Sequence, residues 1–182
     1  MTVPLEFEVD DAVILLLGSD AGRREETGEV KGITRLEKLI FLLERETDAG
    51  KYLTESPAFE AYNFGPFSQK VYQAIDTLVS AGLVEDSAQL SQNNEDTWEL
   101  SKVIGDDYTA STYSTRNFTL TELGREYFDA LKTELPPAVV AQVGELRKKF
   151  SGWPLRQLVR YVYERYDSFT QKSLIRDEIL GT

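Results

Sequence analysis

The chain has 182 residues, of which 20 are basic, 31 are acidic and none is histidine or cysteine, so its formal net charge is −11. Without histidine and cysteine there is no Ser-His-Asp triad, no thiolate nucleophile, no disulfide and no zinc site built from these ligands. The 41% of hydrophobic and 28% of charged residues are typical of a globular protein. We predict no catalytic residue, no metal site and no cofactor.

Nothing in the sequence is typical of a membrane protein. The longest apolar run, residues 12–17, has six residues, whereas a membrane-spanning helix needs about 20. The residues before this run are acidic, whereas a signal peptide is basic there. We therefore expect a cytoplasmic protein without membrane contact.

The first helix is predicted to start at the caps Asp10 and Asp11 and to end near Leu17. Residues 19–32 are polar and glycine-rich, which predicts a flexible connection. Within it, residues 29–31 (EVK) have the acid-x-Lys spacing of a restriction-type nuclease. Such a site needs its carboxylates on a strand to hold Mg²⁺, so the predicted loop argues against it.

The second helix begins with Thr34 and Glu37, which have the spacing of a capping box, and Gly50 is placed to end it. The aromatic-rich residues 58–64 predict a short extended segment that Gly65-Pro66 breaks, and the flanking Phe64 and Phe67 are expected to pin this turn to the core. The expected buried stripe of the helix is Leu36, Leu39, Ile40 and Leu43.

A third helix follows the N-cap Ser68 and ends before Gly82, with a buried stripe of Val71, Ile75, Leu78 and Val79. The residue composition predicts β-strands at residues 83–84, 97–103, 108–114 and 117–120. An acidic loop is predicted at 85–96.

Thr121 is the expected cap of a fourth helix, which Pro136-Pro137 ends. Two more helices are predicted over about 138–150 and 154–166, and a short one begins near Ser173. The expected buried face of the fourth helix is Leu123, Tyr127, Phe128 and Leu131.

Three helices, a strand, a long hairpin, a strand and a helix follow one another in the order of a winged helix-turn-helix domain. We therefore predict a mostly α fold with a small antiparallel β-wing, in the α+β class. Residues 1–135 would form the winged-helix domain. Residues 136–182 would form a helical extension that packs on it or makes a dimer interface.

Four stretches carry a family resemblance: GITRLEKLIFLL (32–43), YNFGPFS (62–68), FTLTELG (118–124) and LVRYVYERY (158–166). Together they resemble a family of prokaryotic winged-helix proteins of the YwgA type. In its TRLxKLxFLL and YxxGPFS signatures that family is similar to the Panacea domain of antitoxins. The resemblance implies a winged-helix fold and a regulatory or neutralising role, without a catalytic residue.

In a winged helix the third helix enters the major groove of double-stranded DNA. Gln69, Lys70 and Gln73 are residue types that reach base edges, while Ser68 and Lys70 are suited to hold phosphate. Alternatively, Ser68 is only an N-cap and the others form a solvated face. Arg35 and Lys38 lie three residues apart and are expected to share a helix face as a second basic patch.

Other features oppose DNA binding. Roughly twenty residues separate the second and third helices, whereas the DNA-binding motif uses a turn of three or four. The wing is acidic, and phosphate repels such a surface. Its acidic residues are Glu85, Asp86, Glu95, Asp96, Asp106 and Asp107, against Lys102 and Arg116.

The basic residues of the C-terminal region have alternative roles. Arg147, Lys148 and Lys149 suit the negative end of a helix dipole. Arg156 and Arg160 share a face interleaved with tyrosines, which suits phosphate or a protein interface equally. The expected anchors of a homodimer are Trp153, Tyr161 and Phe169.

Two functions thus stay open. The first is a winged-helix DNA-binding transcriptional regulator, expected as a homodimer. The second is a protein-interaction module on the same fold, antitoxin-like or an accessory protein of a defence system. Its acidity would steer it toward a basic partner, although salt adaptation gives the same acidity. The sequence does not specify a DNA site, a partner, an effector or the oligomeric state.

Overall fold

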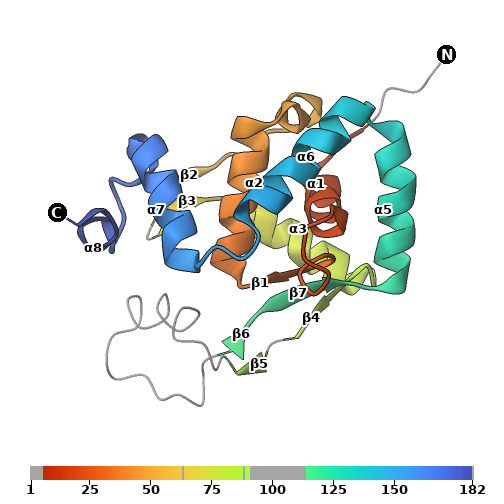
Figure 1. Cartoon of the computed structure of the whole chain (residues 1–182), viewed down its shortest axis with the longest axis horizontal. Coiled ribbons are helices and arrows are strands. Elements are labelled where there is room, and N and C mark those ends of the chain that lie inside the picture. The colour runs from red at the N-terminus through yellow and green to blue at the C-terminus, as the bar shows by residue number, and fades with distance from the viewer. Residues whose placement is uncertain (1–5, 63, 88, 91–113, 182) are drawn as a thin grey trace.

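The computed structural model describes residues 6–62, 64–87, 89–90 and 114–181 (Figure 1). Within these ranges the protein is mostly helical with small antiparallel sheets, so the α+β class is confirmed. The predicted strand at 97–103 and nearly all of that at 108–114 lie outside the described residues. So do the wing residues Glu95, Asp96, Lys102, Asp106 and Asp107.

The predicted helices are confirmed to within a few residues, and none in the described ranges is long and apolar enough to cross a membrane. The helices are α1 (Val9–Gly18), α2 (Ile33–Glu46), α3 (Gln69–Ser80), α5 (Glu122–Glu134), α6 (Pro137–Phe150), α7 (Leu155–Arg165) and α8 (Arg176–Leu180). Short 3-10 helices η1 (Asp48–Tyr52) and η3 (Asp167–Phe169) follow α2 and α7.

Helix α1 lies at the centre of the molecule, in contact with α2, α3, α5 and α6 and with the main sheet (Figure 1). Its run from Ala12 to Leu17 is completely buried. A helix that is apolar on all sides is stable only when other elements cover every side.

The main sheet has the strand order β1-β7-β4, all antiparallel, with β1 (Glu29–Lys31), β7 (Asn117–Leu120) and β4 (Val84–Asp86). Val30 opposes Phe118, and both side chains are buried. The predicted flexible connection at 19–32 is therefore wrong at its end, because the EVK tripeptide is strand β1. A three-residue strand is too short for its alternation to be recognised in sequence.

A second, two-stranded sheet pairs β2 (Glu60–Tyr62) with β3 (Gly65–Phe67), and a third pairs β5 (Gln89–Leu90) with β6 (Ser114–Thr115). The extended segment at 58–64 is thus confirmed in β2. Gly65-Pro66 does not end the extended structure, however, because both residues continue into β3. Gly65 has φ +87°, and a Cβ there would lie 2.6 Å from Tyr163 Cε1.

Two of the four predicted helix caps are confirmed. The hydroxyls of Ser68 and Thr121 accept backbone N–H groups at the starts of α3 and α5. The capping box of α2 is wrong, because Gly32 is its N-cap and Thr34 lies inside the helix. At the start of α1 it is Asp11 that accepts the backbone N–H of Glu8, at 2.9 Å.

The C-terminal helices share one hydrophobic core with the rest of the chain. Val143 and Phe150 of α6 and Leu158 and Val162 of α7 belong to the same buried cluster as α1 and α2. A smaller cluster joins α7 to α8 through Tyr163 and Ile179. Residues 136–182 thus pack against the preceding helices, while a role in dimerisation stays a prediction.

Two helical glycines lead to opposite stability predictions. A Cβ on Gly124 would lie 2.1 Å from the carbonyl oxygen of Leu83, whereas a Cβ on Gly144 would meet nothing within 4 Å. We expect Gly124→Ala to lower the free energy of unfolding by about 1–3 kcal/mol through steric strain. Gly144→Ala should raise it by about 1 kcal/mol, because alanine favours the helix.

Urea denaturation of both variants measures this difference. Equal effects of the two substitutions would show that the close packing of α5 on the turn at Leu83 is absent in solution.

Candidate binding surfaces and a pocket lined by arginine

Helix α3 offers little positive charge to a nucleic acid. Ser68 is fully buried, and its hydroxyl donates to the carbonyl of Pro57 at 2.5 Å and accepts Val71 N–H at 3.2 Å. It is a structural cap, so its predicted contact with phosphate is wrong. Lys70 Nζ lies 2.5 Å from a Glu55 carboxylate oxygen. Only Gln69 and Gln73 are exposed as predicted, and both are neutral.

Arg35 and Lys38 do not form the predicted basic surface patch. Lys38 is only 2% exposed, and its ammonium donates to the carbonyl of Pro66 at 3.0 Å. Arg35 is half-buried and donates to the carbonyls of Trp153, at 2.7 Å, and Lys31, at 3.2 Å. Both cations are used inside the molecule, because strand β3 and the α6–α7 junction lie against α2.

A buried carboxyl group lies next to Lys38 in the sequence. Glu37 is 2% exposed and accepts the backbone N–H of Ser68 at 3.1 Å. Its other oxygen has no hydrogen-bond partner among the described residues. Burial raises the pKa of Glu37 to about 8, although Lys38 and the Ser68 N–H favour the charged form. Glu37 therefore joins α2 to the start of α3.

Carboxylates predominate among the described residues of the predicted wing. Arg116 is half-buried and pairs with Asp86 at 2.8 Å and with Asp76 of α3 at 3.4 Å, while Glu85 is exposed. The guanidinium of Arg116 thus faces two carboxylates of its own chain. A phosphate backbone would have to compete with both.

The predicted dimer anchors are largely used within the chain. Trp153 and Tyr161 pack their rings edge-on against Phe150, at centroid distances of 4.9 and 5.0 Å, and Phe169 packs against Phe41 at 5.0 Å. All three are half-buried. Arg156 and Arg160 are exposed and pair with Glu178 at 3.3 Å and Glu164 at 2.8 Å.

Helix α5 has an exposed apolar surface that was not predicted. Leu123 and Tyr127 are 52% and 42% exposed, so their assignment to the buried face is wrong. Only Phe128 and Leu131 of that face pack inward, in a stripe with Gly124 and Leu135. The helix carries two adjacent apolar stripes, and periodicity alone does not decide which one the core takes.

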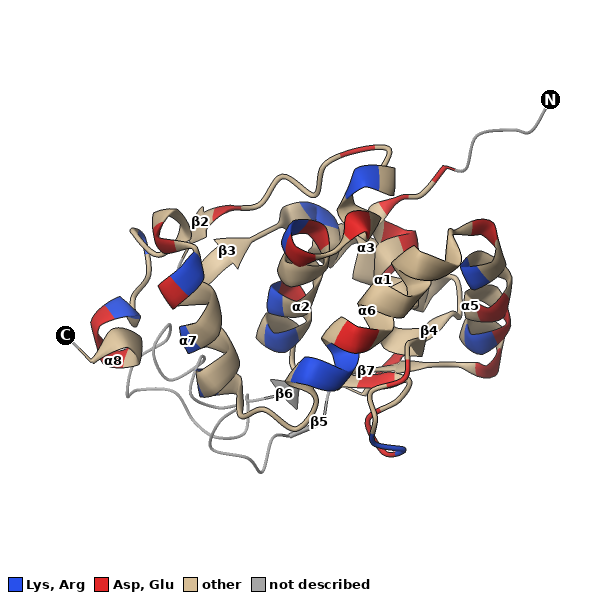
Figure 2. Ribbon diagram, turned by 45° about the horizontal axis from the view of Figure 1, so that its top comes forward, with Lys and Arg blue, Asp and Glu red and all other residues tan. Residues whose placement is uncertain are grey.

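Acidic side chains lie along one side of this apolar pair, and the stripe that faces the core lies on its other side. We call Leu123 and Tyr127 with the exposed acids Glu122, Glu126 and Asp129 the α5 surface. Helix α5 carries four acidic residues (122, 126, 129 and 134) and two basic ones (125 and 132). Figure 2 shows acidic residues along the length of this helix at the edge of the molecule. The surface therefore has an apolar part with an acidic rim along one side.

A cavity of about 310 Å³ lies between the loop before β1, the start of α2 and the junction of α6 with α7. Its apolar part is formed by Val30, Leu39, Phe150, Trp153 and Pro154. Its charged lining is four basic residues (Arg23, Lys31, Arg35 and Arg147) and three acidic residues (Glu25, Glu26 and Glu29).

Arg147 is the most deeply buried of these cations, at 3% exposed. It donates to three backbone carbonyls, of Leu16 at 3.2 Å, Glu26 at 2.8 Å and Glu29 at 2.7 Å. Within the described part of the chain no carboxylate lies at ion-pair distance from it. Burial lowers the pKa of Arg147 to about 10, so it stays charged at neutral pH.

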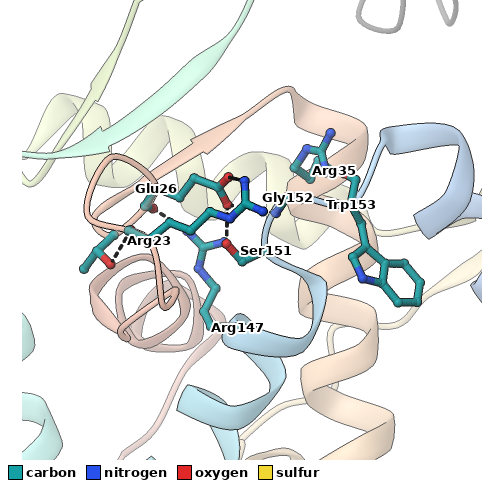
Figure 3. A network of polar contacts seen from close by, with 8 residues as sticks. Arg23, Glu26, Arg35, Arg147, Ser151, Gly152 and Trp153 are labelled. Carbon is teal, nitrogen blue, oxygen red and sulfur yellow. Dashed lines mark hydrogen bonds and ion pairs between the residues drawn. The ribbon is translucent and has the colours of Figure 1, made fainter.

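Figure 3 shows Arg147 reaching from α6 toward the loop that carries Arg23 and Glu26. The Glu26 carboxylate accepts the Ser151 hydroxyl at 2.5 Å and the Gly152 N–H at 3.1 Å, and lies 3.8 Å from Arg23. Partial burial would raise the pKa of Glu26, but these donors lower it below its usual value. This network holds the loop before β1 against the α6–α7 junction.

The acid-x-Lys tripeptide lies on strand β1, but it lacks the partners of a magnesium site. In the described ranges no group of three acidic side chains is placed to hold a metal ion. Glu29 and Lys31 instead line the arginine-rich cavity. A comparison of the chain with protein-family models, curated proteins and solved structures finds no match.

The buried Glu37 makes stability depend on pH. Its pKa rises from 4.5 to about 8 on folding, so the folded protein binds the proton more tightly than the unfolded chain. The free energy of unfolding should therefore fall as pH rises from about 4.5 to 8. Glu37→Gln removes this titration, and its urea-denaturation profile should be flatter over the same range.

Glu122→Gln, at an exposed position of α5, is the control and should retain the wild-type slope. A Glu37→Gln profile as steep as that of the wild type would contradict this role of Glu37.

Proposed function

We propose that the protein is a non-catalytic protein-interaction module on a winged-helix scaffold, antitoxin-like or accessory in role, and that the α5 surface contacts its partner. The observation that carries the proposal is the exposure of Leu123 and Tyr127, at 52% and 42%, beside Glu122, Glu126 and Asp129. An apolar patch with charged side chains at its rim is typical of protein interfaces. Acidic rim residues favour a basic partner.

The charge of the wing and α3 supports a protein partner over DNA. Of the predicted DNA contacts, Ser68 and Lys38 are buried, and Lys70 is paired with Glu55. Arg116, at the base of the wing, is paired with Asp76 and Asp86. DNA binding requires cations that replace the counterions of phosphate, and this face offers few.

A DNA-binding transcriptional regulator is the second candidate. The strand order β1-β7-β4 behind helices α1 to α3 supports the winged-helix scaffold, in which α3 would face the major groove. Gln69 and Gln73 on the exposed side of α3 are able to contact adenine.

A gel-shift experiment separates the two candidates. With random-sequence duplex, micromolar protein and ~50 mM salt, we expect no retarded complex, because nonspecific binding depends on phosphate-neutralising cations. The control is the variant Gln69→Glu/Gln73→Glu. A salt-sensitive complex with the wild type that this variant abolishes would establish the DNA-binding candidate and contradict our proposal.

The α5 surface is tested by affinity purification of the tagged full-length protein from its native host. We expect a partner to be retained by the wild type, to be lost with Leu123→Glu and to be released as salt rises, because the rim is charged. The matched control is Leu174→Glu, since Leu174 is a leucine of similar exposure, 55%, near α8.

Retention of the partner by Leu123→Glu, or its equal loss with Leu174→Glu, would exclude the α5 surface as the contact. Recovery of the wild type without any partner would count against the module itself.

A further inference from the structure

The cavity beside Arg147 gathers positive charge in an acidic protein. Four basic residues and three acidic residues line it, which leaves one net positive charge where the whole chain carries −11. The Glu26 carboxylate is already held by the Ser151 hydroxyl and the Gly152 N–H. Although partial burial raises the pKa of Glu26, these two donors and Arg23 lower it below its usual value, so Glu26 stays ionised and offsets one of the cations.

Arg147 is buried without a carboxylate at ion-pair distance among the described residues. Its guanidinium is buried, and the acceptors of its hydrogen bonds are carbonyl oxygens of α1 and of the segment before and within β1. Carbonyls satisfy N–H donors but carry no net charge, so they leave the charge of a buried guanidinium without compensation by direct contact. Burial lowers the pKa of Arg147, the nearby Glu26 carboxylate raises it, and the nearby Arg35 lowers it further. An anion in the cavity would be attracted by both guanidinium groups.

The rest of the lining is apolar. Val30 and Leu39 are at most 2% exposed, and Phe150 is 3% exposed, so they offer a rigid wall. The volume of about 310 Å³ is at the lower end of the range for small-molecule pockets. An inorganic ion alone would leave this apolar wall without a contact.

From this combination we propose that the cavity binds a small organic anion, with a carboxylate or phosphate group facing Arg35 and Arg147 and an apolar body against Leu39 and Phe150. Arginine forks bind both kinds of oxyanion through paired hydrogen bonds. The cavity spans β1, α2 and the α6–α7 junction, so its ligand would contact elements far apart in the sequence. This binding site does not depend on the α5 surface.

Isothermal titration calorimetry of the full-length protein with benzoate and with phenyl phosphate tests the proposal. Two comparison probes each lack one of these features. Inorganic phosphate has the charge but no apolar body, and benzyl alcohol has the apolar body but no charge. We expect one or both aromatic anions to bind at least about tenfold more tightly than either comparison probe, because only they use both parts of the lining. The stronger of the two aromatic anions identifies the preferred oxyanion.

The charge requirement is tested with Arg23→Gln/Lys31→Gln, which removes two exposed cations of the cavity rim. The matched control, Lys51→Gln/Lys132→Gln, removes two exposed cations that line no part of this cavity. Affinity for the aromatic anion should fall about tenfold in the first variant and by less than about twofold in the second. Unfolding curves should show both variants folded.

Three results would overturn the proposal. These are the absence of binding heat for both aromatic anions at ~5 mM, equal affinity for benzyl alcohol, and an equal loss of affinity in the two double variants. None of them would affect the partner contact at Leu123, so a failure here is distinguishable from a failure of the interaction module.

Discussion

The complete burial of helix α1 is the constraint on which the rest of the structure depends. Its run of six residues from Ala12 to Leu17 has no solvent exposure, although the helix has only ten residues. Helices from both ends of the chain and the main sheet are needed to cover such a helix, which explains why α6 shares a core with α2. The close contact of Gly18 with the ring of Phe128, where a Cβ would lie 2.3 Å from the ring, brings α5 against the same helix.

Buried charged side chains also join the packed elements, through hydrogen bonds to backbone groups. Arg147 reaches across the core to the carbonyl of Leu16, and Lys38 and Glu37 of α2 contact the backbone of Pro66 and Ser68. Each of these side chains satisfies backbone groups that helices and strands leave unpaired, and removal of either partner would leave a buried polar group unsatisfied. The same use of charge explains why Arg35 and Lys38 do not form a surface patch and why Arg147 lies beside the cavity.

The local signals in the sequence predicted helices well and charged surfaces poorly. The stripe of α2 and three of the four predicted stripe residues of α3 are buried, with Val79 half-buried, and Ser68 and Thr121 cap the helices that follow them. In α2, however, Thr34, Glu37 and Lys38 are buried beside the stripe, because hairpin β2–β3 and α7 pack against the side that an amphipathic pattern assigns to water. In α5 the error is the reverse: Leu123 and Tyr127 were predicted to be buried but are exposed, because they lie just beside the stripe that faces the core. Strand β1 was missed because three residues carry too little periodicity.

The amino-acid sequence by itself determined where the long helices lie, which residues cap α3 and α5, and that histidine and cysteine chemistry is absent. These properties depend on neighbours a few residues apart, and local periodicity and capping report them directly. Tertiary structure alone decided which cations are exposed, which of two apolar stripes on α5 the core takes, and that Arg147 lies beside a cavity. Arg147 and Leu16 are 131 residues apart, and Glu37 and Ser68 are 31 apart. Contacts of that separation depend on how every element packs, so no short window of sequence contains them.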